Sequence, residues 1–194
     1  MSLTGISNTS LTDEGRRVRG PGSPQRRAQE APRGLTNTHR GRIRPPPATP
    51  AQGANIVSYL QARIGQQIDR GECWDAAERA IQSIGARRPG SDLYVWGSVV
   101  QRSNLQPGDV LQFSQFTTTT EDADGNTQTY TFGLPRHTAV VASVNSDGSV
   151  NLLHQNFGGR IVSSLDTIYL SGGAQGSVTV TVSGSVTCYR PQLP

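Results

Sequence analysis

Residues 70–78 read Arg-Gly-Glu-Cys-Trp-Asp-Ala-Ala-Glu, which places a cysteine where a glycine-containing loop enters a predicted helix. A thiol in the first turn of a helix feels the positive end of the helix dipole and the free backbone N–H groups there. Such surroundings favour the thiolate, which is the nucleophilic form of cysteine. We therefore interpret Cys73 as a candidate nucleophile. The alternative is a small, partly buried apolar residue.

Two short helices are predicted around this stretch. Order is expected to begin near Ala54, and glycines at 65 and 85 could end the two helices. The apolar positions with helical spacing are Ile56, Leu60 and Ile64 in the first helix, and Trp74, Ala77, Ile81 and Ile84 in the second.

The remainder of the chain predicts antiparallel strands joined by turns. The expected strands span 110–113, 116–120, 127–132, 137–144, 149–156 and 177–190. The turn at 122–126 carries carboxylates that resemble a calcium loop, but it lacks the full ligand set and favours a plain Asp-Gly turn. In the last strand, alternation puts Cys188 on a valine-rich face, so we expect a core residue there. Helices followed by such a sheet indicate an α+β fold.

The charge of the chain is divided unevenly. Residues 1–50 hold nine arginines and three carboxylates, which gives +6, and residues 51–194 hold nine arginines and eleven carboxylates, which gives −2. We expect residues 1–52 to form a disordered Arg/Pro/Gly-rich segment and residues 53–194 to form the folded domain. No aromatic residue is interleaved with these arginines, so specific nucleic-acid binding is not expected. A solvated leader or linker is favoured, and the sequence names no partner for it.

Targeting signals are not evident. Residues 1–7 lack a basic stretch followed by an apolar core, so no Sec-type signal peptide is predicted, and no apolar run could span a membrane. A cytoplasmic location and export by a non-classical route both remain open. Two cysteines provide no disulfide framework, and neither a metal nor a cofactor is expected.

A nucleophilic thiol requires a base, and two regions downstream could supply one. His137 opens an apolar strand and is the candidate base, with a satisfied surface or core histidine as the alternative. His154 and Asn156 share a strand face by alternation, and either could orient that base. The backbone N–H of Cys73 and the side chain of Gln67 are candidate oxyanion donors, although Gln67 could equally be an ordinary helix-end residue.

Several short blocks, taken in order, resemble the CHAP family of papain-like cysteine amidases and peptidases. They are Gly71–Asp75, Leu105–Phe113, His137–Val141, Asp147-Gly148 and His154–Asn156. The likeness covers roughly residues 54–190. It implies a papain-like cysteine proteinase fold of the NlpC type, with Cys73 as nucleophile, His137 as base and His154 where many members carry a carboxylate. The blocks are also similar to cysteine-proteinase-fold domains of certain fungal cortical actin-patch proteins.

Two functional hypotheses follow. The resemblance implies a cysteine amidase or endopeptidase that cleaves amide bonds in a peptide or in peptidoglycan through a Cys-His-His/Asn site. The alternative is a non-catalytic protein-interaction module that has this fold and a disordered docking tail. A histidine at the position usually held by a carboxylate motivates the alternative, because a neutral residue stabilises an imidazolium less well.

Overall fold

The computed structural model describes residues 44–194, and the expected disorder of residues 1–43 lies outside this range. Helix α1 (Pro50–Gln61) begins a few residues before the expected domain start. Thr49 and Gln52 cap it: the Thr49 amide donates to Gln52 Oε1 at 2.9 Å, and the Gln52 amide donates to the Thr49 hydroxyl at 3.3 Å. The expected disorder is therefore wrong for residues 50–52, which form the first turn of α1, and residues 44–49 lead into that helix.

The second helix begins at the residue that the sequence singled out. Helix α2 (Cys73–Gln82) has Cys73 as its first residue and Glu72 as its N-cap. Gly85 follows the helix with a φ of 77°, a left-handed conformation that glycine adopts at little cost.

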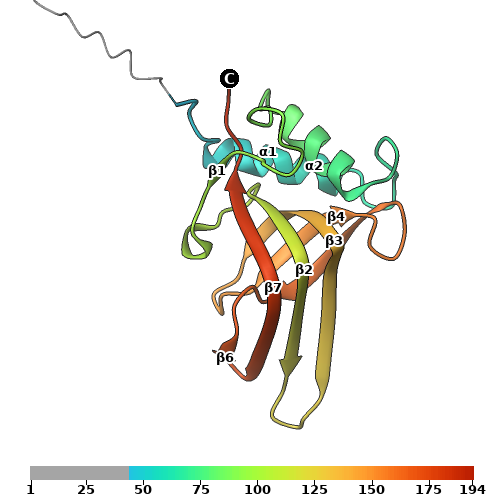
Figure 1. The fold of residues 1–194 in the computed structure, drawn as a ribbon, viewed down its shortest axis with the longest axis vertical. Coiled ribbons are helices and arrows are strands. Elements are labelled where there is room, and N and C mark those ends of the chain that lie inside the picture. Colours follow the sequence, from blue (N-terminus) through green and yellow to red (C-terminus); the bar gives the residue numbers. More distant parts are fainter. Residues whose placement is uncertain (1–43) are drawn as a thin grey trace, which may run out of the picture. The chain divides into compact units, whose positions relative to one another are not determined.

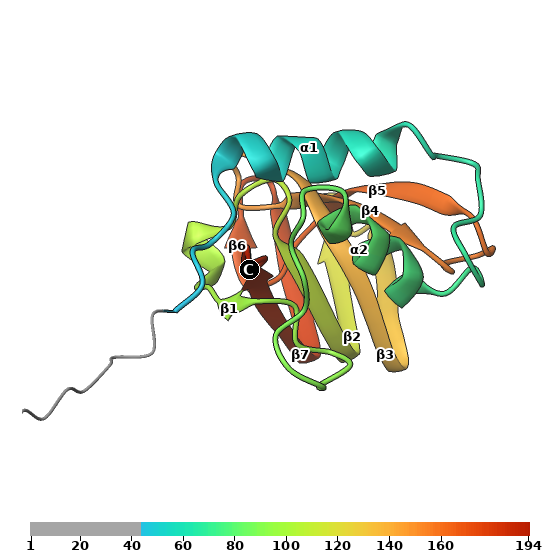
Figure 2. The ribbon, with the colours of Figure 1, turned by 90° about the horizontal axis from the view of Figure 1, so that it is seen from above.

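One antiparallel sheet completes the domain. Its strand order is β1-β7-β2-β3-β4-β5, with β6 paired to β7. Both helices lie across one end of this sheet (Figures 1 and 2). The observed elements are β1 (Ser98–Val99), a 3-10 turn (Arg102–Asn104), β2 (Val110–Glu121), β3 (Thr127–Val144), β4 (Val150–Gln155), β5 (Val162–Ile168), β6 (Gly173–Gln175) and β7 (Val178–Arg190). The α+β expectation is confirmed.

Strands β2 and β3 are each longer than predicted, because a bulge joins segments that the sequence suggested were separate. The register shifts between Ser114 and Phe116, and the β3 side of the bulge contains Gly133 with a φ of 72°. The β2–β3 hairpin consequently projects well beyond the helices (Figure 1).

Both faces of the sheet are buried near the helices. Because strand side chains alternate, Val140 and Leu153 pack with the helices, and Ala139, Val141 and Leu152 pack into a second cluster on the opposite face. This second cluster also holds Cys188, which is 2% exposed, so its expected place in the core is confirmed.

The first and last described segments of the domain lie side by side. The Ala48 amide donates to the Pro191 carbonyl at 2.8 Å, and Pro47 forms a β-bridge with Gln192. Within residues 44–194, no helix is long and apolar enough to cross a membrane.

Candidate functional site

A buried carboxylate organises the loop that leads to Cys73. Asp75 accepts hydrogen bonds from the amides of Arg70 and Glu72, both at 3.1 Å, and forms an ion pair with the Arg70 guanidinium at 2.8 Å. Burial alone would raise the pKa of Asp75, but the bonds from Arg70 and Glu72 outweigh it, and the pKa is lowered. Asp75 is therefore ionised, and its bonds to Arg70 and Glu72 fix the loop at the start of α2.

Gln155 fixes the same loop from the sheet. Its side chain accepts from the Ile68 amide at 2.7 Å, and donates to the carbonyls of Ile68 at 3.1 Å and Glu72 at 2.9 Å. The residue is fully buried at the end of β4. The chain before Cys73 is thus bonded directly to a central strand.

Thr138 is the sheet residue that faces Cys73. Burial of the thiol raises its pKa, and the neighbouring backbone and side chain of Thr138 oppose this to a smaller extent. The net result is a raised pKa for Cys73. This direction is opposite to the one expected from the helix terminus, because burial outweighs the favourable effect of the neighbouring groups.

A buried polar network continues from Thr138 into the core. The Thr138 hydroxyl donates to Gln112 Oε1 at 2.8 Å, and the indole of Trp96 donates to the same oxygen at 3.1 Å. The Gln112 amide nitrogen donates to the His137 carbonyl at 3.0 Å. The network contains no group that titrates near neutral pH.

The two candidate histidines contact each other. Nε2 of His137 lies 2.9 Å from Nδ1 of His154, and the ring planes are perpendicular. Phe157 packs against both rings, with centroid distances of 5.9 Å to His137 and 4.9 Å to His154. Their exposed fractions are only 5% and 1%. The pair therefore belongs to the aromatic core of the second cluster.

The protonation state of the pair follows from burial. Burial lowers the pKa of His137 to about 4, and burial followed by the proximity of His137 lowers the pKa of His154 to about 3. Nε2 of His154 is buried without a partner in residues 44–194. Because an unpaired lone pair costs less than an unpaired N–H, we assign the proton to Nδ1 of His154, which then donates to His137.

The thiol and the imidazoles belong to opposite faces of the sheet. The Thr138 side chain shares Gln112 Oε1 with Trp96 of the helical cluster, so alternation directs the neighbouring His137 to the other face, where its ring packs beside Phe132. The expected contact between His137 and His154 is present. Within residues 44–194, neither ring forms a hydrogen bond with Cys73, and the two rings bond to each other.

The other predicted site residues have different partners. Strand β4 ends at Gln155, and Asn156 turns away with a φ of 63° to donate to the Glu72 carboxylate at 2.9 Å. Asn156 therefore does not share a strand face with His154 as expected. Gln67 is exposed, and its amide donates to the Asp69 carbonyl at 3.0 Å.

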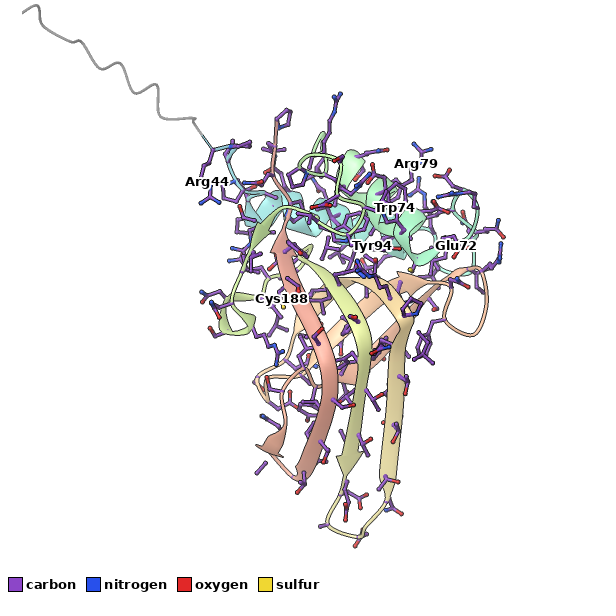
Figure 3. All side chains as sticks on the ribbon, viewed as in Figure 1. Arg44, Glu72, Trp74, Arg79, Tyr94 and Cys188 are labelled. Atoms are coloured by element: carbon purple, nitrogen blue, oxygen red, sulfur yellow. The ribbon has the colours of Figure 1, made fainter. Side chains whose placement is uncertain are left out.

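An open groove is lined by Cys73, and its other lining residues include Glu72, Trp74 and Tyr94, which Figure 3 labels. One cavity of about 330 Å³ is lined by Glu72, Cys73, Trp74 and neighbouring residues, and Trp74 Nε1 donates to the Leu93 carbonyl at 2.7 Å. A second cavity of similar volume continues beyond Tyr94. The two cavities share Leu93, Tyr94 and Arg136.

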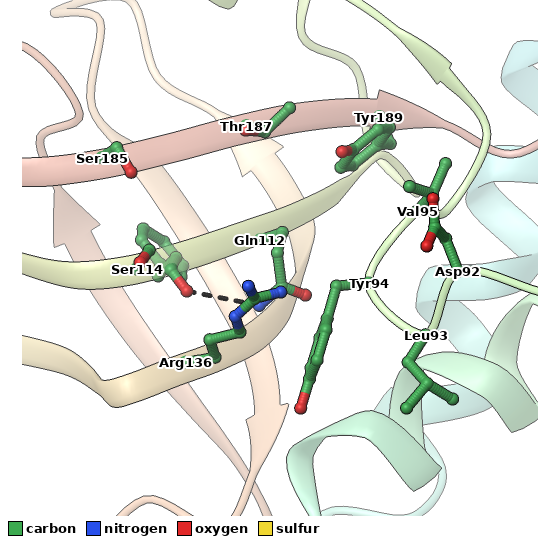
Figure 4. Close-up of a pocket in the computed structure, with 11 residues that line it drawn as sticks. Asp92, Leu93, Tyr94, Val95, Gln112, Ser114, Arg136, Ser185, Thr187 and Tyr189 are labelled. Atoms are coloured by element: carbon green, nitrogen blue, oxygen red, sulfur yellow. Dashed lines mark hydrogen bonds between the residues drawn. The ribbon is translucent and has the colours of Figure 1, made fainter.

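Arg136 marks the middle of this groove. Its guanidinium lies over the Tyr94 ring at 4.5 Å from the centroid, and Figure 4 shows it pointing between Tyr94 and Gln112. The ring quadrupole attracts the cation and holds it in the groove. Asp92 and the hydroxyls of Ser185 and Thr187 line the far end. The groove is therefore amphipathic, with both signs of charge.

Metal binding has no structural support among residues 44–194. No group of three or more His, Cys, Asp or Glu side chains there is placed to hold an ion. In the turn that resembles a calcium loop, Asp122 Oδ1 accepts from the amides of Asp124 and Asn126, both at 2.9 Å. This bonding is that of an Asx-type turn.

A cysteine at the start of a helix, laid across one end of an antiparallel sheet, defines a domain with a cysteine proteinase fold. The chain belongs to the AIM3/BBC1 cysteine proteinase-fold domain family, whose model matches residues 48–191. This match supports the papain-like fold and does not support the narrower CHAP or NlpC-type assignment. Neither a curated protein nor a solved structure matches the chain.

Proposed function

We propose that the domain is a non-hydrolytic protein-interaction module. The observation that carries the proposal is the environment of Cys73: within residues 44–194 its thiol forms no hydrogen bond with a histidine, since His137 and His154 bond to each other, and its pKa is raised by burial. Cysteine hydrolases require a base that withdraws the thiol proton and later protonates the leaving amine. A threonine hydroxyl cannot accept that proton near neutral pH, and here it already donates to Gln112.

The groove beside Cys73 is the proposed binding surface. Trp74 and Leu93 offer apolar area, and Leu93 is 56% exposed. Arg136 offers a charged, planar donor already oriented by Tyr94. Aromatic and arginine side chains are the groups that most often dominate protein–protein contacts. An extended peptide segment of a partner protein suits these features.

Alkylation kinetics test the absence of an activated thiol. We expect iodoacetamide to modify Cys73 slowly at pH 7, because an ordinary thiol with a pKa of about 8.5 is only about 3% ionised there and burial raises the pKa of Cys73. A thiol activated by an imidazolium would be almost fully ionised, which is an increase of roughly 30-fold in reactive fraction. The rate should rise steadily up to and beyond pH 8.5. The Cys73→Ala variant measures the background from Cys188.

A rapid, pH-independent reaction of Cys73 between pH 5 and 8 would contradict the proposal. So would cleavage of any peptide substrate by the wild-type protein that is lost in Cys73→Ala. Both measurements use the full chain and need no knowledge of the partner.

A cysteine amidase or endopeptidase acting on peptidoglycan is the second candidate. The position of Cys73 at a helix N-terminus, lining a cavity, favours it. Cys73 would attack the amide carbonyl to form a thioester, and His137 would transfer the thiol proton to the leaving amine. Water would then hydrolyse the thioester and restore the thiol. His154 or Asn156 would orient His137, and Gln67 and the Cys73 amide would hold the oxyanion. Mass spectrometry of peptidoglycan digests with wild type and Cys73→Ala decides this hypothesis. Fragments released by both proteins equally, or by neither, exclude it.

A further inference from the structure

The outer half of β3 has one unpaired edge. Residues Thr127–Phe132 pair with β2 on one side, whereas β4 pairs with β3 only from Ala139 to Val144. Within residues 44–194, no strand pairs with the other side of Thr127–Phe132. Figure 1 shows this length of β3 at the outside of the projecting hairpin. We refer to Thr127–Phe132 as the β3 edge.

The register identifies the backbone groups that this edge presents. The Asp122 amide donates to the Asn126 carbonyl at 3.0 Å, so these two residues form a hydrogen-bonded pair at the end of the hairpin. Such pairs alternate along an antiparallel ladder. The backbone N–H and C=O groups of Thr127, Thr129 and Thr131 therefore point away from β2, at the open edge.

The β3 edge lacks the usual protection against strand pairing. Edge strands are commonly blocked by lysine, proline or a bulge. None occurs within Thr127–Phe132, and the bulge at Gly133 and the following Pro135 come only after it. Six residues of extended strand provide roughly 20 Å of regular template.

The side chains of this edge differ between its two faces. Tyr130 and Phe132 stack at 6.3 Å, and the half-buried Phe157 stacks on Phe132 at 5.3 Å. On the opposite face, Thr129 and Thr131 already hydrogen-bond to threonines of β2, at 2.9 Å and 3.2 Å. A strand added here would meet aromatic side chains on one face and threonine on the other.

The tip of the hairpin is acidic. Glu121, Asp122 and Asp124 lie there, and residues 110–133 contain no arginine or lysine. Hydrogen bonds from Asn126 lower the pKa of Asp122, so it is ionised at neutral pH. None of the three carboxylates forms an ion pair with another described residue. A second copy of this chain would bring the same three charges and no basic residue from its own hairpin.

We propose that the β3 edge binds an extended basic segment of a partner protein by strand addition. The backbone of that segment pairs with Thr127, Thr129 and Thr131, its apolar side chains lie against Tyr130, and its basic residues lie beside the acidic tip. This surface is separate from the groove beside Cys73, and it does not depend on the inactivity of the thiol.

A synthetic peptide tests the proposal with the full chain. The probe is Thr-Val-Thr-Val-Thr-Arg-Arg, and the matched control has glutamate in place of both arginines. Fluorescence anisotropy should show binding of the basic peptide that is at least about tenfold tighter than that of the acidic one, and that weakens with added salt. Hydrogen exchange at the amides of Thr127, Thr129 and Thr131 should slow by about tenfold or more at saturation.

Two variants at one position separate backbone pairing from side-chain contact. Thr129→Pro removes an outward N–H that the hairpin itself does not use, so the fold should persist and binding should be lost. Thr129→Val keeps that N–H and should bind normally. The exchange measurement on the wild-type chain needs no variant, so it decides the question even if the proline variant does not fold.

Three results would overturn the proposal. One is equal affinity for the basic and acidic peptides. Another is unchanged binding by a folded Thr129→Pro variant. The third is strong protection of the three amides before any peptide is added, because the edge would then already be occupied by the chain itself or by a second copy.

Discussion

Acidification should destabilise the domain through the buried pair of His137 and His154. Both rings are neutral in the folded state, with pKa values of about 4 and about 3, against an ordinary value of 6.5 in the unfolded chain. Since both folded-state values are lowered, the unfolded state takes up protons first as the pH falls. The stability is therefore fully present above pH 6.5 and declines as the pH drops toward 4.

The size of the effect at pH 5 can be estimated from these values. A solution pH of 5 is about 1.5 units below the pKa of each ring in the unfolded chain. Each unit corresponds to 1.36 kcal/mol, which gives about 2 kcal/mol per ring. Both folded rings are still largely neutral at pH 5, so their mutual repulsion does not enter. We expect a total loss of about 4 kcal/mol between pH 8 and pH 5.

Urea denaturation at pH 8, 7, 6 and 5 measures this loss, with the free energy of unfolding extrapolated to zero urea. The double variant His137→Gln, His154→Gln should give a nearly flat profile over the same range, whatever its absolute stability. His39→Gln, outside the described residues, is the matched control and should retain the slope. A wild-type loss below about 1 kcal/mol, or an equal slope in the double variant, would refute the reasoning.

Two further substitutions test the supports of the site. Gln155→Leu removes three hydrogen bonds to the loop at 68–72 and should cost about 3 kcal/mol in chemical denaturation, with faster hydrogen exchange in that loop. Gly108→Ala should lower the melting temperature far more than Gly85→Ala, although both glycines have positive φ. A Cβ at 108 would lie 2.4 Å from the Gly53 backbone, whereas a Cβ at 85 meets nothing within 4 Å.

Much of the fold could be predicted because its signals are local. Helical spacing and glycines located both helices, and turn residues located the main hairpins. The continuity of β3 could not be predicted from the same signals. Gly133 and Pro135 resemble the end of a strand, and only pairing with β2 across the bulge shows that the strand continues. Strand β6 is three residues long and carries no periodic signal.

The candidate site was harder to predict, because a one-residue difference decides which face of a strand a side chain occupies. Around His137 both faces of β3 are buried, so hydrophobic alternation does not reveal which one meets the helices. In β4, His154 packs with Phe132 and Phe157, whereas Gln155 bonds to the loop before α2 from the other face. The face that meets the Cys73 loop carries Gln155 and Thr138, and neither residue titrates, so a search for titratable groups does not identify it.

The pairing of Pro47 with Gln192 has a consequence for how the domain can be connected. These two segments are hydrogen-bonded neighbours. A polypeptide attached before Pro47 and another attached after Gln192 would therefore leave the domain at the same place. A short linker could join them, and new termini could be opened in the exposed turn at 122–126 without cutting either core. The domain is therefore suited to insertion as a unit within a loop of another protein.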